Sequence, residues 1–573
     1  MPSASPDSLD RRVKWGLLLA SLATVALLIY SVLAECVWPQ WRMLRAQYAQ
    51  ILKAKATDDR GRALAEQFEA TIQQNVLPAL HTVDRCITCH PAVDDPRMAG
   101  EKQPFRTHPG DFLRLHQPDT YGCTACHAGQ GRATEQAAAH GDVEFWPSPM
   151  IPARYAYAGC GSCHTHVLVP SQAVLRRGRD AIARYGCLAC HTLDGGGVKL
   201  PGVAGAAGPD LSQVGATGYD AGWYEKHVAR AANADGGNGP SLRPIGEPAR
   251  ADLSRFLASR VGAPSLVEAK ALFHSLGCRG CHKVNGVGGK EGPDLSRVGE
   301  KDPGRMDFTH VPGEPTLANW LAEHFRRPAA VVPGSQMPVL GLTEEQIDGL
   351  TLYMLSLRHS SIPETYQPKD RIRAERFGER EFATDGETLY STFCAACHGA
   401  SGQGMRYPGL PVSPAIASPD FLAVAADAFI AHTVQHGRPG RRMPAWGEKE
   451  GGLRPQEIQA IVAYLRSMSG LAAPEPDRQP ARWVKGDTTA GNSLFATYCA
   501  SCHGATGQGA EGPALNNTVL LASASDTYLT ETIRRGRRGT VMAGFEKPST
   551  VHPALTPSEI ESIVSYIRTW ETP

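Results

Sequence analysis

The chain has 573 residues, and its 58 lysines and arginines against 57 aspartates and glutamates give a formal net charge of +1. This balance excludes a basic nucleic-acid-binding protein and gives no reason to expect a strongly acidic partner. The 59 glycines and 43 prolines exceed the combined ~12 % that is usual in globular proteins. The composition therefore favours short helices joined by long loops.

The first predicted element is a membrane-spanning helix. The run from Trp15 to Ala34 carries no charge, and about twenty residues suffice to cross the ~30 Å hydrocarbon core of a bilayer. Three basic residues precede the run, which predicts a cytoplasmic N-terminus. A cleaved signal peptide is the alternative, because Val32-Leu33-Ala34 resembles a cleavage site. The length of the run and the tryptophans that follow it favour an uncleaved anchor in residues 1–35.

Residues 36–80 are predicted to form an amphipathic helical stalk. Apolar residues such as Leu44, Tyr48 and Ile51 recur at helical spacing among many charges. Such a stalk could hold the following domains away from the membrane or pack on a helix of a partner.

From residue 86 onward the pentapeptide Cys-x-x-Cys-His occurs seven times and contains every cysteine except Cys36. Two cysteines at this spacing can form thioether bonds to one haem, with the next histidine as proximal iron ligand. A redox dithiol, a zinc site or a disulfide would not require a histidine after every second cysteine. We therefore predict seven covalently bound haem c groups. The attachment residues are Cys86, Cys89, Cys123, Cys126, Cys160, Cys163, Cys187, Cys190, Cys278, Cys281, Cys394, Cys397, Cys499 and Cys502, and the proximal ligands are His90, His127, His164, His191, His282, His398 and His503.

The first three motifs lie within residues 81–170, too close together for three separate cytochrome folds. We expect one loop-rich trihaem domain there. Three irons need three distal ligands, and the segment has five spare histidines but only two methionines. Bis-histidine coordination is therefore predicted, with His108, His116 and His140 as distal ligands, although a single histidine in a polar loop is more often a surface residue.

This segment resembles a family of membrane-anchored multihaem cytochromes. The resemblance covers about residues 36–170. It rests on Val83-Asp84-Arg85-Cys86, on Gly122 to His127 with Gly129-Gln130-Gly131-Arg132-Ala133, and on Ala139-His140-Gly141. That family is associated with quinol-oxidising cytochrome b complexes of bacterial respiratory chains. The resemblance implies a respiratory electron-transfer role without identifying the complex.

From residue 171 onward a unit of helix, haem motif, loop and closing helix occurs four times. It resembles the class I cytochrome c domain, in which a proline loop supports the proximal histidine. Gly208-Pro209, Gly292-Pro293 and Gly512-Pro513 follow three of the motifs. The predicted domains are 171–262, 263–360, 380–470 and 485–573, with closing helices at 251–259, 342–357, 453–468 and 555–570.

The predicted fold class is thus mainly α, with a transmembrane helix, a stalk, a trihaem domain and four class I cytochrome c-like domains. Linkers rich in proline and charge, at about 360–384 and 470–488, are expected to separate the last two domains from their neighbours. Their separation suggests a module that docks a redox partner.

In the class I family a methionine before the last helix is the sixth iron ligand. Met337, Met443 and Met542 stand at this place in three of the units. A lone methionine is usually core filler, but the repeated position indicates distal ligands.

The unit around Cys187 departs from this pattern, because Arg243 stands where the methionine is expected. Arginine keeps its proton and cannot bind iron. This haem is expected to be five-coordinate or to take another ligand, such as His227. However, His227 corresponds to His324 in a unit that already has its methionine, which favours a structural role.

Methionine ligation raises the potential of a haem, so the low-potential end is predicted to be N-terminal. We expect electrons to pass from a cytochrome b-type or other respiratory membrane complex to a soluble cytochrome or oxidase. The alternative is a haem enzyme that reduces peroxide or a nitrogen oxide at the open haem of Cys187, with Arg243 stabilising negative charge. An electron-carrying subunit is favoured over a catalyst. The haem domains are expected on the periplasmic side of the inner membrane.

Overall fold

The computed structural model describes residues 6–194, 196, 208–219, 221–232, 244–359, 362–550 and 552–571. The described chain is mostly helical and divides into two compact units. The first comprises Met1–Gly159, Lys301–Met306 and Ser361–Tyr366, and the second comprises Cys160–Glu300, Asp307–Ser360 and Gln367–Pro573.

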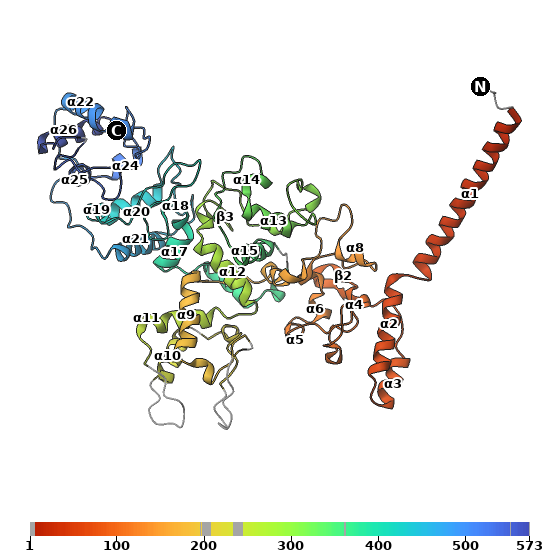
Figure 1. Ribbon diagram of the computed structural model, residues 1–573. Helices are drawn as coiled ribbons and strands as arrows, with labels where there is room; N and C mark the ends of the chain where they lie inside the picture. The colour runs from red at the N-terminus through yellow and green to blue at the C-terminus, as the bar shows by residue number, and fades with distance from the viewer. Residues whose placement is uncertain are drawn as a thin grey trace. The chain divides into compact units, whose positions relative to one another are not determined.

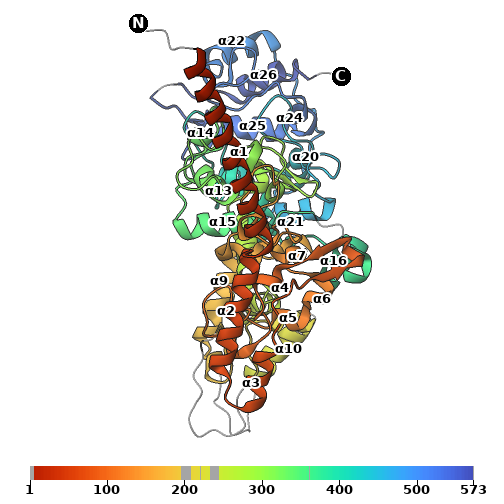
Figure 2. The same cartoon turned by 90° about the vertical axis from the view of Figure 1, so that its right-hand side faces the viewer.

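The N-terminal element α1 (Pro6–Cys36) is one continuous helix in both views (Figures 1 and 2). Its segment Asp10–Cys36 has a mean hydropathy of 2.4, and none of its most apolar part is buried within the protein. A helix that leaves so many apolar side chains uncovered is stabilised by lipid. The structure thus contains the predicted helix, which is long and apolar enough to cross a membrane.

The predicted stalk is helical only as far as Glu66. It consists of α2 (Gln40–Lys55) and α3 (Asp59–Glu66), whereas β1 (Asn75–Leu77) pairs antiparallel with β2 (Thr82–Asp84). The apolar stripe of α2 is also not free, because Tyr48 is buried in a small core with Ala92, Met98, Phe68 and Phe105. The stripe therefore covers the first haem-motif segment.

The rest of the first unit is built from short helices, as the glycine and proline content predicts. The elements are η1 (Pro78–Leu80), α4 (Cys86–Cys89), η2 (Pro96–Met98), α5 (Phe112–Leu115), α6 (Pro118–Tyr121), α7 (Thr124–His127), α8 (Gln136–His140) and most of η3 (Ala153–Ser162).

The second unit contains four pairs of crossing helices, which confirms the predicted repeat. The pairs are α9 (Gln172–Arg184) with α11 (Glu247–Ala258), α12 (Pro264–Ser275) with α15 (Glu344–Ser356), α17 (Gly386–Phe393) with α21 (Pro455–Ser469), and α22 (Thr488–Tyr498) with α26 (Pro557–Arg568). In three of the pairs a glycine permits the close crossing. A Cβ atom on Gly178, Gly386 or Gly491 would lie 2.0–2.4 Å from the partner helix.

Further helices fill the loops between these pairs. They are α10 (Ala221–Ala232), α13 (Leu317–Arg326), α14 (Pro328–Val331), α16 (Lys369–Phe377), α18 (Ala395–His398), α19 (Pro419–Leu422), α20 (Asp427–His436), α23 (Ala500–His503), α24 (Thr518–Ser523) and α25 (Asp526–Arg535), with the short strands β3 (Lys283–Val284) and β4 (Val287–Gly288). Figure 1 shows α17 to α21 in cyan and α22 to α26 in blue.

The last two domains share one hydrophobic core, so the linker at about 470–488 does not hold them apart as expected. The core runs from Phe382 to Ile567. The ring centroids of Phe429 and Tyr528, one from each domain, lie 4.5 Å apart. Apolar faces on both domains are large enough to pack together, which composition alone could not reveal.

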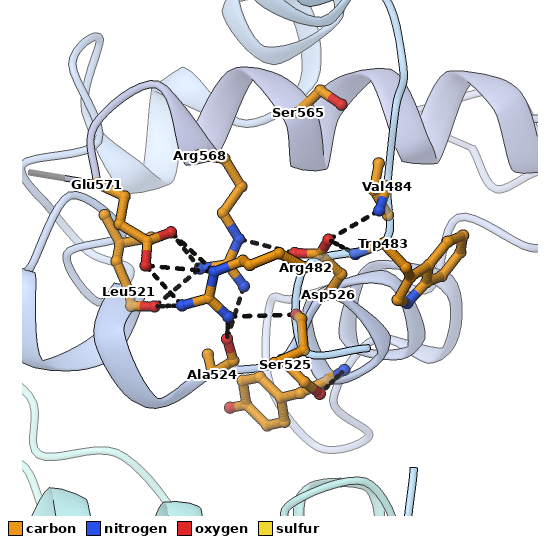
Figure 3. A network of polar contacts seen from close by, with 12 residues as sticks. Arg482, Trp483, Val484, Leu521, Ala524, Ser525, Asp526, Ser565, Arg568 and Glu571 are labelled. Carbon is orange, nitrogen blue, oxygen red and sulfur yellow. Dashed lines mark hydrogen bonds and ion pairs between the residues drawn. The ribbon is translucent and has the colours of Figure 1, made fainter. Parts of the chain in front are cut away.

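A buried ion-pair network fastens residues 482–484 to the last domain (Figure 3). The Asp526 carboxylate is 2 % exposed. It accepts hydrogen bonds from Arg568 Nε at 2.7 Å and from the backbone amides of Trp483 and Val484 at 2.8 and 2.9 Å. Glu571 pairs with Arg568 and with Arg482. The end of the proline-rich linker is therefore part of the folded domain.

Candidate haem-binding sites

All seven Cys-x-x-Cys-His motifs adopt one helical turn. In each, the histidine amide donates to the carbonyl of the first cysteine at 2.8–3.0 Å. Among the described residues no cysteine is in a disulfide. The repeated turn gives every motif the same local backbone, with both thiols and the imidazole available to one haem.

In the four units of the repeat, a proline carbonyl orients the proximal histidine. The Nδ1 atoms of His191, His282, His398 and His503 lie 2.8–2.9 Å from the carbonyl oxygens of Pro209, Pro293, Pro414 and Pro513, respectively. A histidine that donates from Nδ1 keeps the Nε2 lone pair free for a metal. These residues therefore fit haem ligation.

Pro414 was missed by sequence reasoning. The other three prolines follow a glycine, whereas Pro414 follows Ser413. A search for any proline in the loop after the motif, with or without a preceding glycine, could have identified Pro414.

The glycine before the proline leaves room for the imidazole. A Cβ atom on Gly292 would lie 2.3 Å from Cε1 of His282, and one on Gly208 would lie 2.4 Å from Cε1 of His191. The Gly-Pro pair therefore both clears space for the ring and supplies its hydrogen-bond acceptor.

Replacing Gly292 by alanine should displace the His282 ring and break its 2.9 Å contact with Pro293. We expect the haem to stay covalently attached but to lose its low-spin absorption spectrum, and the protein to lose about 1–3 kcal/mol of stability from overpacking. Optical spectra and thermal unfolding of the haem-loaded protein check this. Gly262→Ala is the matched control, because a Cβ atom there meets nothing within 4 Å. An unchanged spectrum in Gly292→Ala would contradict the steric argument.

Burial favours the neutral form of three of these histidines, and the neutral imidazole is the form that binds iron. Burial lowers the pKa of His282, His398 and His503, against an opposing hydrogen bond to the proline carbonyl. Burial also lowers the pKa of His90 and His127, and the charges of His140 and His108, respectively, add to the effect.

Two of the three predicted distal histidines lie near proximal histidines. The ring centroids of His108 and His127 are 6.2 Å apart with an interplanar angle of 65°. Two imidazoles that each place a nitrogen about 2 Å from one metal have ring centres roughly 6 Å apart. His140 lies close enough to His90 to affect its charge. His116 packs edge-on against Tyr121 at 5.4 Å.

The two spare histidines that were not predicted as ligands occupy other environments. His81 ends η1 in the left-handed conformation. His166 is buried, with its ring stacked on that of His164 at 5.8 Å.

Met443 and Met542 occupy equivalent positions in the last two domains. The Met443 carbonyl accepts from the Arg438 amide, and the Met542 carbonyl accepts from the Arg537 amide, both at 2.8 Å. Met337 lies in the loop between α14 and α15, where its amide contacts Ser335 Oγ at 3.3 Å.

His227 and His324 make the same contact in successive units. The His227 ring stacks on Trp223 at 4.9 Å, and the His324 ring stacks on Trp320 at 5.0 Å. The shared arrangement fits the structural role expected for His227. Arg243, the residue expected above the haem of Cys187, lies outside the described residues.

A buried carboxylate joins the first two haem motifs. Asp84 accepts hydrogen bonds from the amides of Cys86, Cys123 and Thr124 at 3.0, 2.7 and 2.9 Å. Burial alone would raise the pKa of Asp84, but these contacts lower it overall, so the group stays ionised. An Asp84 oxygen and the sulfurs of Cys86 and Cys123 lie within 4.8 Å of one another. Because both cysteines belong to haem motifs, we assign this cluster to the haem sites.

A second pair of motifs meets in the second unit. The thiols of Cys281 and Cys397 lie close enough to shift each other's pKa. A Cβ atom on Gly277 would lie 2.7 Å from the Ala396 amide. The domain at 263–360 and the domain at 380–470 therefore bring their haem motifs into contact.

Three segments of the chain match known cytochrome families. Residues 266–358 and 488–571 match the family described as cytochrome c, and residues 381–465 match cytochrome c oxidase, cbb3-type, subunit III. Together with the seven motifs and the N-terminal apolar helix, these matches support a membrane-anchored, multihaem c-type cytochrome with covalently bound haem c.

The chain is similar to subunits of cbb3-type cytochrome c oxidases. It is 29 % identical over 237 residues to subunit CcoP of Azospirillum sp. (strain B510), which covers 38 % of this chain and 70 % of that protein. It is 33 % identical over 193 residues to subunit FixP of Bradyrhizobium sp. (strain ORS 278), which covers 32 % of this chain and 59 % of that protein. The chain thus spans 59–70 % of the length of these relatives.

One solved structure overlaps a larger share of the chain at low similarity. Thiosulfate dehydrogenase (TsdBA) from Marichromatium purpuratum shares 17 % identity over 69 % of this chain and 90 % of that chain, with a TM-score of 0.17. This value is too low to indicate a shared arrangement.

Proposed function

We propose that the chain carries seven haems and conducts electrons from a quinol-oxidising, cytochrome b-type partner to a soluble cytochrome or a terminal oxidase. The observation that supports this most is the meeting of motifs from different segments, Cys86 with Cys123 and Cys281 with Cys397. Haems attached at adjoining cysteines are neighbours, so an electron can pass between them without leaving the protein. A storage role or an isolated catalytic haem would need no such arrangement.

The predicted axial ligands support the direction of transfer. The distance between His108 and His127 fits bis-histidine coordination in the first unit. Met443 and Met542 stand in equivalent loops of the last two domains. Because methionine raises the potential of a haem, electrons are drawn away from the membrane end. The similarity to CcoP and FixP supports an oxidase complex as partner.

Removing the haem of the 263–360 domain should interrupt this path. In Cys278→Ala/Cys281→Ala, quinol-oxidising membranes should still reduce the N-terminal haems. The haems of the last two domains should be reduced more slowly by roughly tenfold or more, which corresponds to an increase of at least about 1.4 kcal/mol in the activation free energy. Stopped-flow spectra of the full haem-loaded protein measure this, with intact mass giving the haem count. Cys36→Ala, which changes a cysteine outside the motifs, is the control. Unchanged reduction of the last domains would contradict the proposed path.

A further inference from the structure

The proximal histidine of the third motif has an unusual partner. His164 Nδ1 lies 3.2 Å from Oδ1 of Asp370, which is 206 positions away in the sequence. Where an acceptor is identified for another proximal histidine, that acceptor is a neutral group. The acceptors are the carbonyls of Pro209, Pro293, Pro414 and Pro513 for the four histidines of the repeat, and Gln103 and Pro104 for His90.

Further hydrogen bonds hold the Asp370 side chain in place. Asp370 belongs to the first turn of α16, and its second oxygen, Oδ2, accepts from the backbone amides of Thr165 and His166 at 3.0 and 3.1 Å. The carboxylate side chain is 26 % exposed. Three N–H groups of consecutive residues thus converge on one carboxylate, which is the pattern of an ionised acceptor.

Lys270, whose charge interacts with Asp370, also has other partners. Lys270 is buried, and its Nζ donates to the carbonyls of Thr165 and His166 at 2.5 and 3.4 Å. Its ammonium group is paired with Glu381 at 3.3 Å. Asp370 thus keeps its direct contact with His164, while Lys270 is paired with Glu381.

We infer that Asp370 lowers the reduction potential of the haem attached at Cys160 and Cys163. The inference rests on the proposed function only in that a haem is attached there. A carboxylate that accepts the Nδ1–H bond makes the imidazole a stronger donor to the metal. A stronger donor with a negative charge beside it stabilises ferric iron relative to ferrous iron. The haem therefore accepts an electron less readily, and its reduction potential falls. Asp370 is thus a positioning residue that acts on the iron through His164.

The position of the third motif in the chain indicates what a lowered potential at its haem would do. The third motif begins the second unit, ahead of the domains in which methionine ligation is predicted. A lowered potential at this haem would make electron transfer out of it, in the direction of the methionine-ligated haems, more favourable.

The test is a spectroelectrochemical titration of the full haem-loaded protein and of Asp370→Asn. The amide keeps the size of the side chain but removes its charge. One component should move to a more positive potential, while the other haems stay where they are. A Cys160→Ala/Cys163→Ala variant, which lacks this haem, identifies the component. An unmoved component, or a move to more negative potential, would overturn the inference.

A second variant keeps the test decisive if Asp370→Asn does not fold. Asp370→Glu retains the charge but displaces it by one methylene, so the same component should shift in the same direction by less. Peptide mapping separates the two proposals. If the haem is present at Cys160 and the potential is unmoved, only the role of Asp370 fails. If no haem is found there, the seven-haem proposal fails, and the role of Asp370 fails with it.

Discussion

Met443→Ala should convert one six-coordinate haem into a high-spin haem that binds carbon monoxide when reduced. Its potential should fall by a sizeable part of the ~0.8 V range over which axial ligands tune haem, because the thioether that favours ferrous iron is gone. The loop should persist, since the Arg438 amide bonds the carbonyl of residue 443 and not its side chain. Carbon monoxide difference spectra and a redox titration measure both effects.

The wild-type protein and a second methionine variant are the controls. Before mutation, carbon monoxide should bind at most the haem of Cys187, whose unit lacks the methionine. Met468→Ala changes a half-buried methionine of α21 in the same domain and should create no new carbon monoxide site. If Met443→Ala also creates none, Met443 is not an iron ligand.

Asp526→Ala should destabilise the last domain by about 3–5 kcal/mol, the cost of breaking a buried ion pair by removing one partner. The change leaves Arg568 without its 2.7 Å acceptor and leaves the amides of Trp483 and Val484 unpaired. Denaturant unfolding of the haem-loaded protein, followed by the spectrum of its haems, measures the loss.

An exposed pair in the same domain is the comparison. Glu546, 52 % exposed, pairs with Arg534, which also has Glu531 as a partner. Glu546→Ala should therefore cost no more than about 1 kcal/mol. Equal losses in the two variants would show that burial of the Asp526 network adds nothing to stability.

The helix pairs were predictable because each carries its apolar periodicity in a short stretch of sequence. The closing helix predicted at 555–570, for example, is observed at Pro557–Arg568. The proline support was predicted in three of the four units, and the fourth was missed because Ser413 replaces the expected glycine. The linker at about 470–488 was expected to separate two domains because it is rich in proline and charge. The same composition also occurs in a segment that is bound to a folded domain, as the buried hydrogen bonds of residues 483 and 484 show.

The sequence by itself determined the chemistry of each haem motif, since five consecutive residues carry the two thiols, the imidazole and the turn that brings them together. It also determined the membrane helix, which needs only an uninterrupted apolar run. Only the tertiary structure decided which motifs meet, as Cys281 and Cys397 do, and which carboxylate reaches His164. Those contacts depend on how helices far apart in the chain pack together, and many weak interactions between distant residues decide that packing.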